Sequence, residues 1–562
     1  MKEKIIAHRK LIDIFVIILV GTFLCIPLLG NVDVYKDDGI QHIARAFGTS
    51  LEIKESFFPN VISNFANGFG YSWNLFYGSL TSYSLVIISL LTGNFINAYK
   101  IFVYICLFLS GITMYKFMHS LTKNNNASIL ASILYMTFPY HLTDLYIRNA
   151  LGEYVSFVFI PLVFLGIYNL FYTDDKLKSP ALTIGACGLI LTHNISTVLV
   201  AFFAMLFVAM NITKLNDKKI KKAFILNVVF IILLTALYWV PLLETLLFAD
   251  YQVYEDGMMA TKESFLESRL DFTQLFVTRN DGSFVFELGP HFMIMFAISL
   301  IGFRKTKHRL KEIHIFCVVS AILSIWMSTK LFPWGLFPEE ISIIQFSWRL
   351  LMMSGFFLST VCALNVFALI KNFNVKDVLV ISVISILYVC AFVGYVVYDD
   401  GIKDINTYTL GVLTGKEYEV IAGTAKGEYL PTKAYDNRFY LASRDNDVFT
   451  LEGKAVIEDI KKDGTNLTAK IETFDAEYTL FELPYLYYPG YTVRFDGTIL
   501  DCVETENGFI GFFIPQKDKG TLEVEYTGTK AMGISLLISC ITLIVFGIYT
   551  IKKEKKPTTL EK

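Results

Sequence analysis

Long apolar runs alternate with short polar or basic segments along most of the chain. The first run, from Leu11 to Gly30, follows a basic N-terminus and precedes no small-residue cleavage site, which predicts a retained membrane helix. Further runs lie at residues 97–120, 127–141, 153–172, 180–213, 222–243, 290–303, 313–331, 349–370, 377–397 and 531–551. This pattern predicts a polytopic α-helical membrane protein.

One of these runs is too long for a single crossing. Residues 180–213, as one helix rising 1.5 Å per residue, would measure about 51 Å. A hydrocarbon layer of about 30 Å, crossed at a steep tilt of about 40°, takes up only about 39 Å of helix. We therefore expect two short spans that meet near Thr192-His193-Asn194, and about twelve spans in all.

Basic residues indicate which side each loop faces. The positive-inside rule assigns five basic segments and both chain ends to the cytoplasm: Lys2 to Lys10, Lys214 to Lys222, Arg304 to Lys311, Lys371 to Lys376 and Lys552 to Lys556. The exterior side then receives a first loop at 31–96, turns at 142–152 and near His193, loops at 244–289 and 332–348, and a block at 399–529. Within the first loop, Ser79 to Thr92 is apolar but short, which predicts a helix that lies at the membrane surface or dips into it.

The block at 399–529 changes to a period of two. Apolar and polar residues alternate at 469–474, 491–495 and 520–526, and Pro489-Gly490, Asp496-Gly497 and Asn507-Gly508 interrupt the alternation. Such a pattern is typical of antiparallel strands and hairpins. We expect three regions: a transmembrane domain at 1–398, an exterior β domain at 399–529, and a last membrane helix with a basic cytoplasmic tail at 530–562.

Composition agrees with a membrane protein and excludes some functions. The 562-residue chain is 54% hydrophobic and 18% charged, whereas an average soluble domain is about 25% charged. A net charge of −2 argues against nucleic-acid binding. Seven of the eight cysteines lie in apolar runs and only Cys502 lies in a polar stretch, which excludes a disulfide framework and a cysteine-based zinc site.

The first exterior loop carries a candidate site. If the segment is helical, Asp38, His42 and Arg45 share one face at positions i, i+4 and i+7. A carboxylate beside an imidazole and a guanidinium suits a general base or a metal site with a phosphate anchor. The same spacing also fits an ordinary solvated helix start with a favourable Asp-His pair.

Further polar positions face the same side. Asp144 and Arg148 are an i, i+4 pair, either part of a site or a structural ion pair. His193 stands in an apolar context, as a hydrogen-bonded turn residue or a ligand. Arg349 follows Trp348 where the chain re-enters the membrane, and a guanidinium there suits a lipid phosphate. The alternative for Arg349 is an anchor that snorkels to the interface.

Taken in order, the polar segments resemble one family. The segments are Asp38-x-x-x-His42-x-x-Arg45, Asn67-Gly68-Phe69-Gly70-Tyr71, Leu75-Phe76-Tyr77, Tyr140-x-x-x-Asp144-Leu-Tyr-x-Arg148-x-Ala150-Leu-x-Glu153, Leu191-Thr-His193-Asn194 and Gln345-Phe-x-Trp348-Arg349. The series resembles bacterial membrane proteins of the YfhO-like type, including those labelled 6-pyruvoyl-tetrahydropterin-synthase-related. The segment from Tyr487 to Gly497 is similar to the exterior β domain of that group. The departure is Ser347, where the related motif has proline.

The pterin label does not imply pterin chemistry here. A pterin synthase holds zinc through histidines, and this chain lacks a His-x-His pair to hold one. The resemblance implies a GT-C-type glycosyltransferase, a multi-spanning enzyme of the bacterial cell membrane. Such an enzyme moves a sugar from a polyprenyl-phosphate carrier to a cell-envelope acceptor outside the cell. An acidic residue in the first exterior loop is typical of the class, and Asp37-Asp38 match it.

The expected mechanism is an inverting transfer with Asp38, or Asp37, as the base. The expected substrate-binding residues are His42, Arg45, Asp144, Arg148, Glu153, His193, Trp348 and Arg349, with the leaving phosphate on Arg349 and on Arg148 or Arg45. No cofactor is required, although Mg²⁺ or Mn²⁺ at Asp37, Asp38 and His42 is compatible with this chemistry. Two alternatives stay open: a flippase or transporter of lipid-linked glycans, and a non-catalytic scaffold for envelope polymers.

Overall fold

The computed structural model of the protein describes most of the chain. The described residues are 2–30, 38–54, 56–173, 180–255, 260–276, 286–297, 308–370, 427–474, 477–515 and 517–554, with a few residues between 302 and 305 and between 376 and 387. Asp37, residues 399–426 of the expected β domain and most of the apolar run at 377–397 lie outside the described residues.

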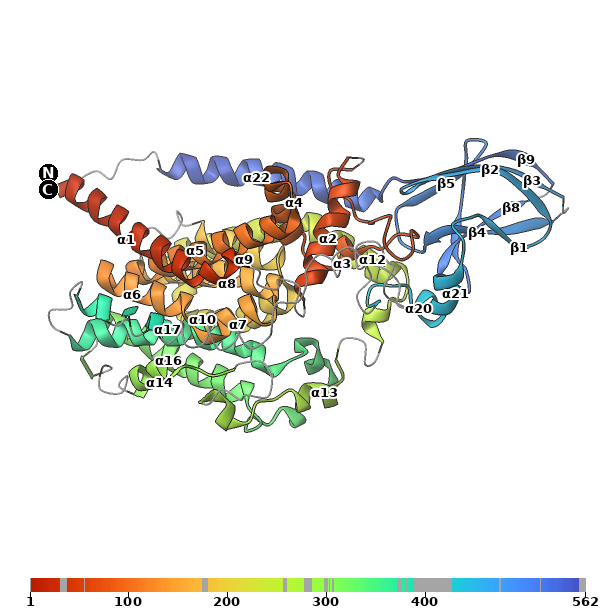
Figure 1. Ribbon diagram of the computed structural model, residues 1–562. Coiled ribbons are helices and arrows are strands. Elements are labelled where there is room, and N and C mark those ends of the chain that lie inside the picture. The colour runs from red at the N-terminus through yellow and green to blue at the C-terminus, as the bar shows by residue number, and fades with distance from the viewer. Residues whose placement is uncertain are drawn as a thin grey trace.

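Helices form an elongated bundle (Figure 1). Its longer helices are α1 (Lys2–Leu24), α5 (Phe95–Thr122), α6 (Asn125–Met136), α8 (Leu151–Tyr172), α10 (Asn194–Met210), α11 (Lys218–Leu234), α12 (Ala236–Phe248), α16 (His308–Ser328), α17 (Leu351–Leu369) and α22 (Lys530–Glu554). Shorter helices connect or flank them: α2 (Gly39–Glu52), α3 (Trp73–Phe76), α4 (Leu80–Thr92), α7 (Pro139–Tyr146), α9 (Ala181–Ile190), α13 (Lys262–Glu267), α14 (Pro290–Ala297), α20 (Thr432–Asp436) and α21 (Arg438–Ser443). Buried apolar side chains pack into one core around Phe164 and Phe356 and another around Val103 and Ile133.

Several of these helices match the dimensions of a bilayer. Within the described residues, five are long and apolar enough to cross one: Phe95–Thr122, Leu151–Tyr172, Leu310–Ser328, Ser347–Leu369 and Lys530–Ile551. The bent pair of α11 and α12 is a sixth candidate, and Leu11–Leu24, Leu80–Thr92, Ala181–Ile190 and Asn194–Met210 are apolar but shorter. The mostly helical, apolar character expected from the sequence is confirmed. The expected number of about twelve spans is not reached by helices of full length.

The apolar run at 180–213 breaks where its length predicted a break. Three residues, including His193, separate α9 from α10. α9 runs antiparallel to α8, because Leu182 packs against Gly166 and His193 against Gly152. α10 then turns back, since the ring of Phe207 lies 6.2 Å from a ring in the second half of α8. The run is therefore a helical hairpin with His193 at its turn.

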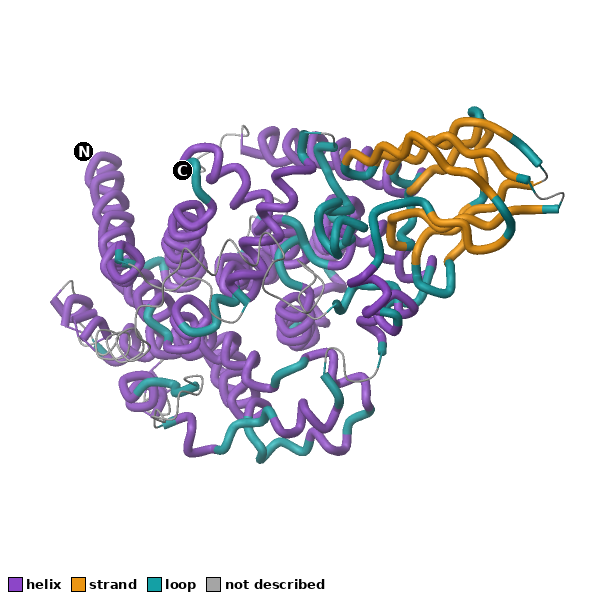
Figure 2. Tube along the Cα trace, turned by 45° about the vertical axis from the view of Figure 1, so that its right-hand side comes forward, coloured by secondary structure: helices purple, strands orange, loops and turns teal. Residues whose placement is uncertain are grey.

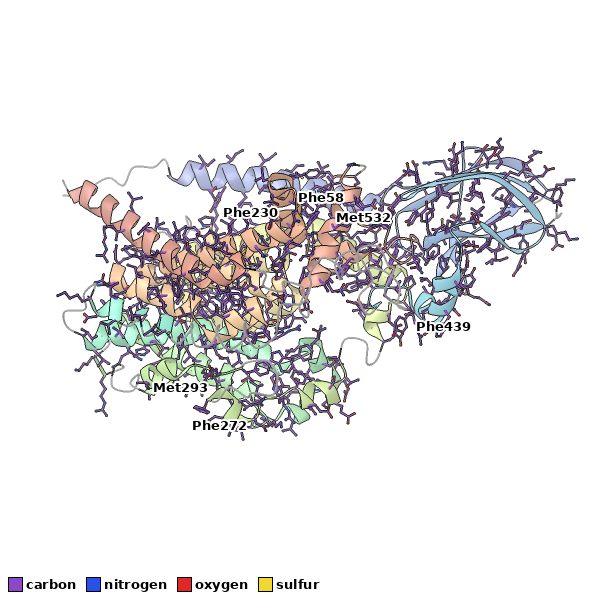
Figure 3. The ribbon with its side chains drawn as sticks, viewed as in Figure 1. Phe58, Phe230, Phe272, Met293, Phe439 and Met532 are labelled. Carbon is purple, nitrogen blue, oxygen red and sulfur yellow. The ribbon has the colours of Figure 1, made fainter. Side chains whose placement is uncertain are left out.

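The C-terminal helix α22 packs against a second break in the bundle, between α11 and α12. α11 and α12 meet at a bend of 62°, which interrupts the regular hydrogen bonds of the helix. The hydroxyl of Ser539 in α22 accepts from the amide of Leu237 and donates to the carbonyl of Leu233. Nearby, Phe230 of α11 points toward α22, and its ring lies 5.1 Å from that of Phe546 (Figure 3). These contacts anchor α22 to the bundle at the bend.

A β domain lies at the end of the molecule opposite to the start of α1 and the end of α22 (Figures 1 and 2). One of its sheets has the strand order β1 (Phe449–Glu452), β4 (Tyr478–Leu486), β8 (Phe509–Pro515), β7 (Cys502–Glu504). The other has the order β2 (Ala455–Asp463), β3 (Asn466–Thr473), β9 (Lys519–Tyr526), β5 (Tyr491–Phe495), β6 (Thr498–Leu500). Neighbouring strands are antiparallel, and the predicted turns at Gly497 and Gly508 join β5 to β6 and β7 to β8. The alternation at 469–474, 491–495 and 520–526 thus gave the correct strands.

The loop that follows α2 and the β domain share an apolar core. The carbonyl of Phe69 accepts from the amide of Leu486 at 3.1 Å, and the hydroxyl of Tyr71 accepts from the amide of Tyr429 at 3.0 Å. Gly70 has φ of +87°, and a Cβ there would lie 2.8 Å from a methyl group of Val61. A residue with a side chain would be strained in this left-handed conformation and would clash. The segment 67–71 is therefore the docking loop for the β domain.

A lysine of β2 completes this contact. The Lys462 ammonium donates to the carbonyls of Gly68 and Pro484 and to the side chain of Asn446. Three acceptors match the three donors of a charged lysine. Burial, with a smaller effect of Arg444, lowers the pKa of Lys462 from its ordinary value of 10.5 to about 7. The contact between loop and domain therefore contains a group that titrates near neutral pH.

Candidate functional site

Charged side chains from distant parts of the sequence gather where α2, α7, α8 and α17 begin or end. Asp38 is the N-cap of α2, Asp144 lies in α7, and Arg148 lies in the connection to α8. Glu153 lies in the first turn of α8, and Arg349 lies in the short 3-10 helix that leads into α17. We call these five residues the charged cluster.

The turn between α7 and α8 is set by local sequence. α7 begins with Pro139 at its first position, where proline fits because no amide hydrogen is needed there. Asn149 adopts φ of +47°, which asparagine tolerates better than most residues, and its amide group donates to the carbonyl of Leu145 at 2.8 Å. This sharp turn brings Arg148 back over α7 and starts α8 next to it.

Arg148 is the centre of the buried part of the cluster. Its Nη1 donates to Asp144 Oδ1 and to Glu153 Oε2, each at 2.9 Å, and to the hydroxyl of Tyr140 at 3.1 Å. The Tyr140 hydroxyl in turn donates to Glu153 Oε1 at 2.7 Å. The side chains of Arg148, Asp144 and Glu153 are at most 3% exposed. A buried charge is tolerated when it is paired and hydrogen-bonded. The Asp144–Arg148 ion pair therefore stabilises the fold, and it lies on the buried side of the cluster.

Arg349 joins the cluster from the other side of Glu153. Its Nε lies 3.3 Å from Glu153 Oε2, and its Nη1 donates to Gln345 Oε1 at 2.6 Å and to the carbonyl of Ile344 at 3.2 Å. The side chain is only 7% exposed, which excludes the interpretation of Arg349 as a snorkelling anchor. None of the described contacts of Arg349 uses Nη2.

Asp38 forms the edge of the cluster. Its Oδ2 lies 3.8 Å from Arg148 Nη2, and its side chain is 47% exposed. Its backbone is held on both sides, because its amide donates to the carbonyl of Arg148 and its carbonyl accepts from the amide of His42. Among the described carboxylates of the cluster, Asp38 is the one that solvent reaches.

The segment after Asp38 is helical, which is the condition for the three side chains to share one face. His42 and Arg45 nevertheless have different partners. Arg45 is fully buried and donates to the carbonyls of Tyr77 and Gly78, at 2.7 and 3.1 Å, and to Asn74 Oδ1 at 2.9 Å. It holds the chain at 74–79 in place and does not point at solvent. Burial, reinforced by Arg45 and opposed by Asp38, lowers the pKa of His42 to about 4. His42 is therefore neutral at pH 7.

His193 is a turn residue that also faces the start of α8. Its Nδ1 accepts from the amide of Ser196 at 3.2 Å and lies 2.7 Å from the hydroxyl of the same residue, which caps α10. Its Cδ2 lies 3.3 Å from the position that a Cβ on Gly152 would occupy. The structure therefore brings His193 to the cluster.

Trp348 packs beside the cluster rather than into it. Its ring stacks on Phe346, with centroids 4.4 Å apart, and contacts Phe286 at 5.0 Å. The departure at Ser347 has a physical reason, because its amide donates to the hydroxyl of Ser268 and its hydroxyl donates to the carbonyl of Ser328. Proline has no amide hydrogen and could not make the first of these bonds.

The donor groups of this region do not form a cation site. Within the described residues, no three His, Cys, Asp or Glu side chains are close enough to hold a metal ion. Asp144 and Glu153 already face the guanidinium of Arg148, which repels a cation. Asp37, one of the three positions considered for an ion, lies outside the described residues. No step is assigned to a metal.

Sequence reasoning gave no role to three residues that the structure brings to the cluster. Tyr140 lies four residues before Asp144 on one helical face, so its spacing was a usable signal. Gln345 holds Arg349, and Tyr77 lies between the first loop and α8. No periodicity signals these two contacts, because each depends on how distant segments pack.

Apolar helices around a charged end define a helical integral membrane protein. The chain belongs to the family described as 6-pyruvoyl-tetrahydropterin synthase related domain, membrane protein, whose model matches residues 75–397. It is also 25% identical to an uncharacterized protein of Lactococcus lactis subsp. cremoris (strain MG1363), over 96% of this chain and 95% of that protein. The family expected from the motifs is therefore confirmed. The matched region holds Arg148, Glu153, His193 and Arg349 but not Asp38 or the β domain.

Proposed function

We propose that this membrane protein is a GT-C-type glycosyltransferase that uses a polyprenyl-phosphate-linked sugar and a cell-envelope acceptor on the exterior face. The observation that carries the proposal is the position of Asp38. A half-exposed carboxylate stands 3.8 Å from Arg148, at the edge of a cluster whose other charged groups are buried. A base must be reachable by the acceptor, and the leaving phosphate needs positive charge beside it.

The proposed step is a single inverting displacement. Asp38 accepts the proton of the acceptor hydroxyl while that oxygen attacks the anomeric carbon. The bond from the anomeric carbon to the phosphate oxygen breaks, and its electron pair leaves with the polyprenyl phosphate. Arg349 and Arg148 stabilise the negative charge, which counts for more in a site shielded from water. Glu153 and Asp144 hold the two guanidinium groups in place for this role.

The proposed orientation is a multi-pass one, with about twelve spans, both termini in the cytoplasm and the β domain outside. Its support is that one basic segment, which contains Lys214, lies at the end of α8 remote from the cluster. Lys214 pairs with Glu312 at 3.8 Å, and Glu312 accepts from the hydroxyl of Tyr172. Tyr172 ends α8, whose first turn holds Glu153, and the positive-inside rule favours the end with Lys214 as the cytoplasmic one.

The test is transfer by purified Asp38→Asn protein. The change removes the proton acceptor with almost no change of volume, and Asp38 makes no contact shorter than 3.8 Å to another charged group in the described structure. Transfer of sugar from a polyprenyl-phosphate donor should fall by roughly 10² to 10⁴-fold, as for loss of a general base. Wild-type rates in this variant would contradict the proposal, and Glu244→Gln is a matched control at an exterior carboxylate bound to Thr529.

A further inference from the structure

Tyr77 stands between the first loop and the start of α8. Its ring meets the rings of His42 and His193, each with centroids 5.9 Å apart, and the guanidinium of Arg45 lies 5.0 Å from the ring centre. Its carbonyl accepts from Arg45 at 2.7 Å, which fixes the backbone at this point. The ring is therefore held in one orientation.

The hydroxyl of Tyr77 reaches the first turn of α8. A Cβ built on Gly152 would lie 2.1 Å from this oxygen, so the close approach requires a residue without a side chain at 152. None of the hydrogen bonds among the described residues uses the hydroxyl of Tyr77, and its side chain is only half-buried. Most tyrosine hydroxyls packed into the bundle do have partners, such as that of Tyr154, which donates to the carbonyl of Val103 at 3.0 Å.

The next residue on α8 links this hydroxyl to the charged cluster. Glu153 follows Gly152 directly, and Arg349 Nε lies 3.3 Å from Glu153 Oε2. Tyr77 and Arg349 thus approach the same helical turn, each with a donor atom that the described protein groups do not use. Burial, with a further contribution from Asp38, raises the pKa of Tyr77 above its ordinary value, so the phenol stays protonated at neutral pH and can donate.

We propose that the Tyr77 hydroxyl donates a hydrogen bond to the phosphate of the lipid-linked donor, next to Arg349. The assignment rests on the proposed function, and it adds one neutral donor to the cationic groups that hold the phosphate. Gly152 is then a positioning residue, because it leaves the space through which the hydroxyl approaches. Contacts with the rings of His42 and His193 help to keep the Tyr77 ring in that place.

The test is binding of farnesyl phosphate, with farnesol as the uncharged probe, to the full-length protein in lipid nanodiscs. Tyr77→Phe keeps every ring contact and removes only the hydroxyl. A hydrogen bond to a charged group is worth about 1.5–3 kcal/mol, so affinity for farnesyl phosphate should fall about 10- to 100-fold while affinity for farnesol stays unchanged. Tyr154→Phe loses a hydroxyl that donates to the carbonyl of Val103 and to no group of the cluster, so it should bind both probes as the wild type does.

A second variant displaces the Tyr77 hydroxyl without removing it. Gly152→Ala places a methyl group where the Tyr77 oxygen now lies and should weaken binding of farnesyl phosphate in the same selective way. If Tyr77→Phe binds farnesyl phosphate as tightly as the wild type does, the Tyr77 assignment is wrong while the proposed function stands. If the wild type does not prefer farnesyl phosphate to farnesol, the proposed donor class fails and the Tyr77 assignment fails with it.

Discussion

The carboxylates of the charged cluster differ in what surrounds them, and this decides what a substitution at each would report. Asp144 and Glu153 are buried against Arg148, so removal of either leaves a buried guanidinium without its partner. Breaking such a pair costs about 3–5 kcal/mol, which is a stability effect. Asp38 is half-exposed, so its substitution tests the proposed role as a base with little expected effect on stability.

Arg349 offers a separate prediction about the donor. Arg349→Lys keeps the positive charge but loses the planar fork that reaches Gln345, Ile344 and Glu153 together. We expect the KM for the lipid donor to rise about tenfold, equivalent to about 1.4 kcal/mol, with a normal amount of protein in the membrane. Donor titration of the purified enzyme measures this. An unchanged KM would remove Arg349 from the phosphate site.

Part of the site could be predicted residue by residue. The helix assumed for Asp38, His42 and Arg45 is present in the structure, and the i, i+4 spacing of Asp144 and Arg148, one interpretation of which was an ion pair, does hold one. The role of Arg45 could not be predicted, because its partners are backbone carbonyls about thirty residues away. A spacing pattern reports neighbours on one helix, whereas these contacts depend on the packing of the whole loop.

Among the elements, the docking loop at 67–71 joins the β domain to the first exterior loop. In the sequence this segment carried only a family resemblance, and the packing against Val61 and Leu486 shows why Gly70 is needed there. The break at His193 and the hairpin turns of the β domain were predictable, since chain length and turn residues act locally. The docking contact joins residues some 400 positions apart and leaves no periodic signal.

The docking contact makes stability depend on pH. The pKa of Lys462 is lower in the folded protein, at about 7, than its ordinary value of 10.5, so the unfolded chain binds more protons between these values. The free energy of unfolding should therefore rise with pH from about 7 toward 10.5. Below pH 7 both states are protonated at Lys462, so this residue causes no change of stability with pH there. Melting temperatures of Lys462→Met should lack this rise, whereas the exposed neighbour Lys461→Met should keep it. A wild-type profile that falls across the window would contradict the assignment.

For the whole molecule, hydropathy located the apolar runs but not the lengths of the helices. The hairpin of α9 and α10 and the short helix α4 are apolar enough to lie in lipid but too short to cross it alone at full thickness. Hydropathy measures composition. The number of crossings depends on where each helix breaks and on which neighbouring helices pack against the break. The general class was therefore predictable and the number of spans was not.

The orientation of the molecule is testable by labelling. Asn466 is exposed at the start of β3, so Asn466→Cys in a Cys502→Ser background should react with a membrane-impermeant maleimide on intact cells. Cys540 lies within α22 and serves as an internal control, because the proposed orientation places it in lipid and predicts no labelling there. Labelling that occurs only after lysis would place the β domain in the cytoplasm and reverse the proposed orientation.

The central claim is that the end of the bundle around Asp38 transfers sugar to the cell envelope. Mass spectrometry of envelope polymers, from cells that lack the protein and cells that carry the wild type or Asp38→Asn, tests it most directly. We predict a sugar substituent that is absent without the protein, restored by the wild type, and not restored by an equal amount of Asp38→Asn. Restoration by Asp38→Asn, or envelope polymers of identical mass with and without the protein, would contradict the account.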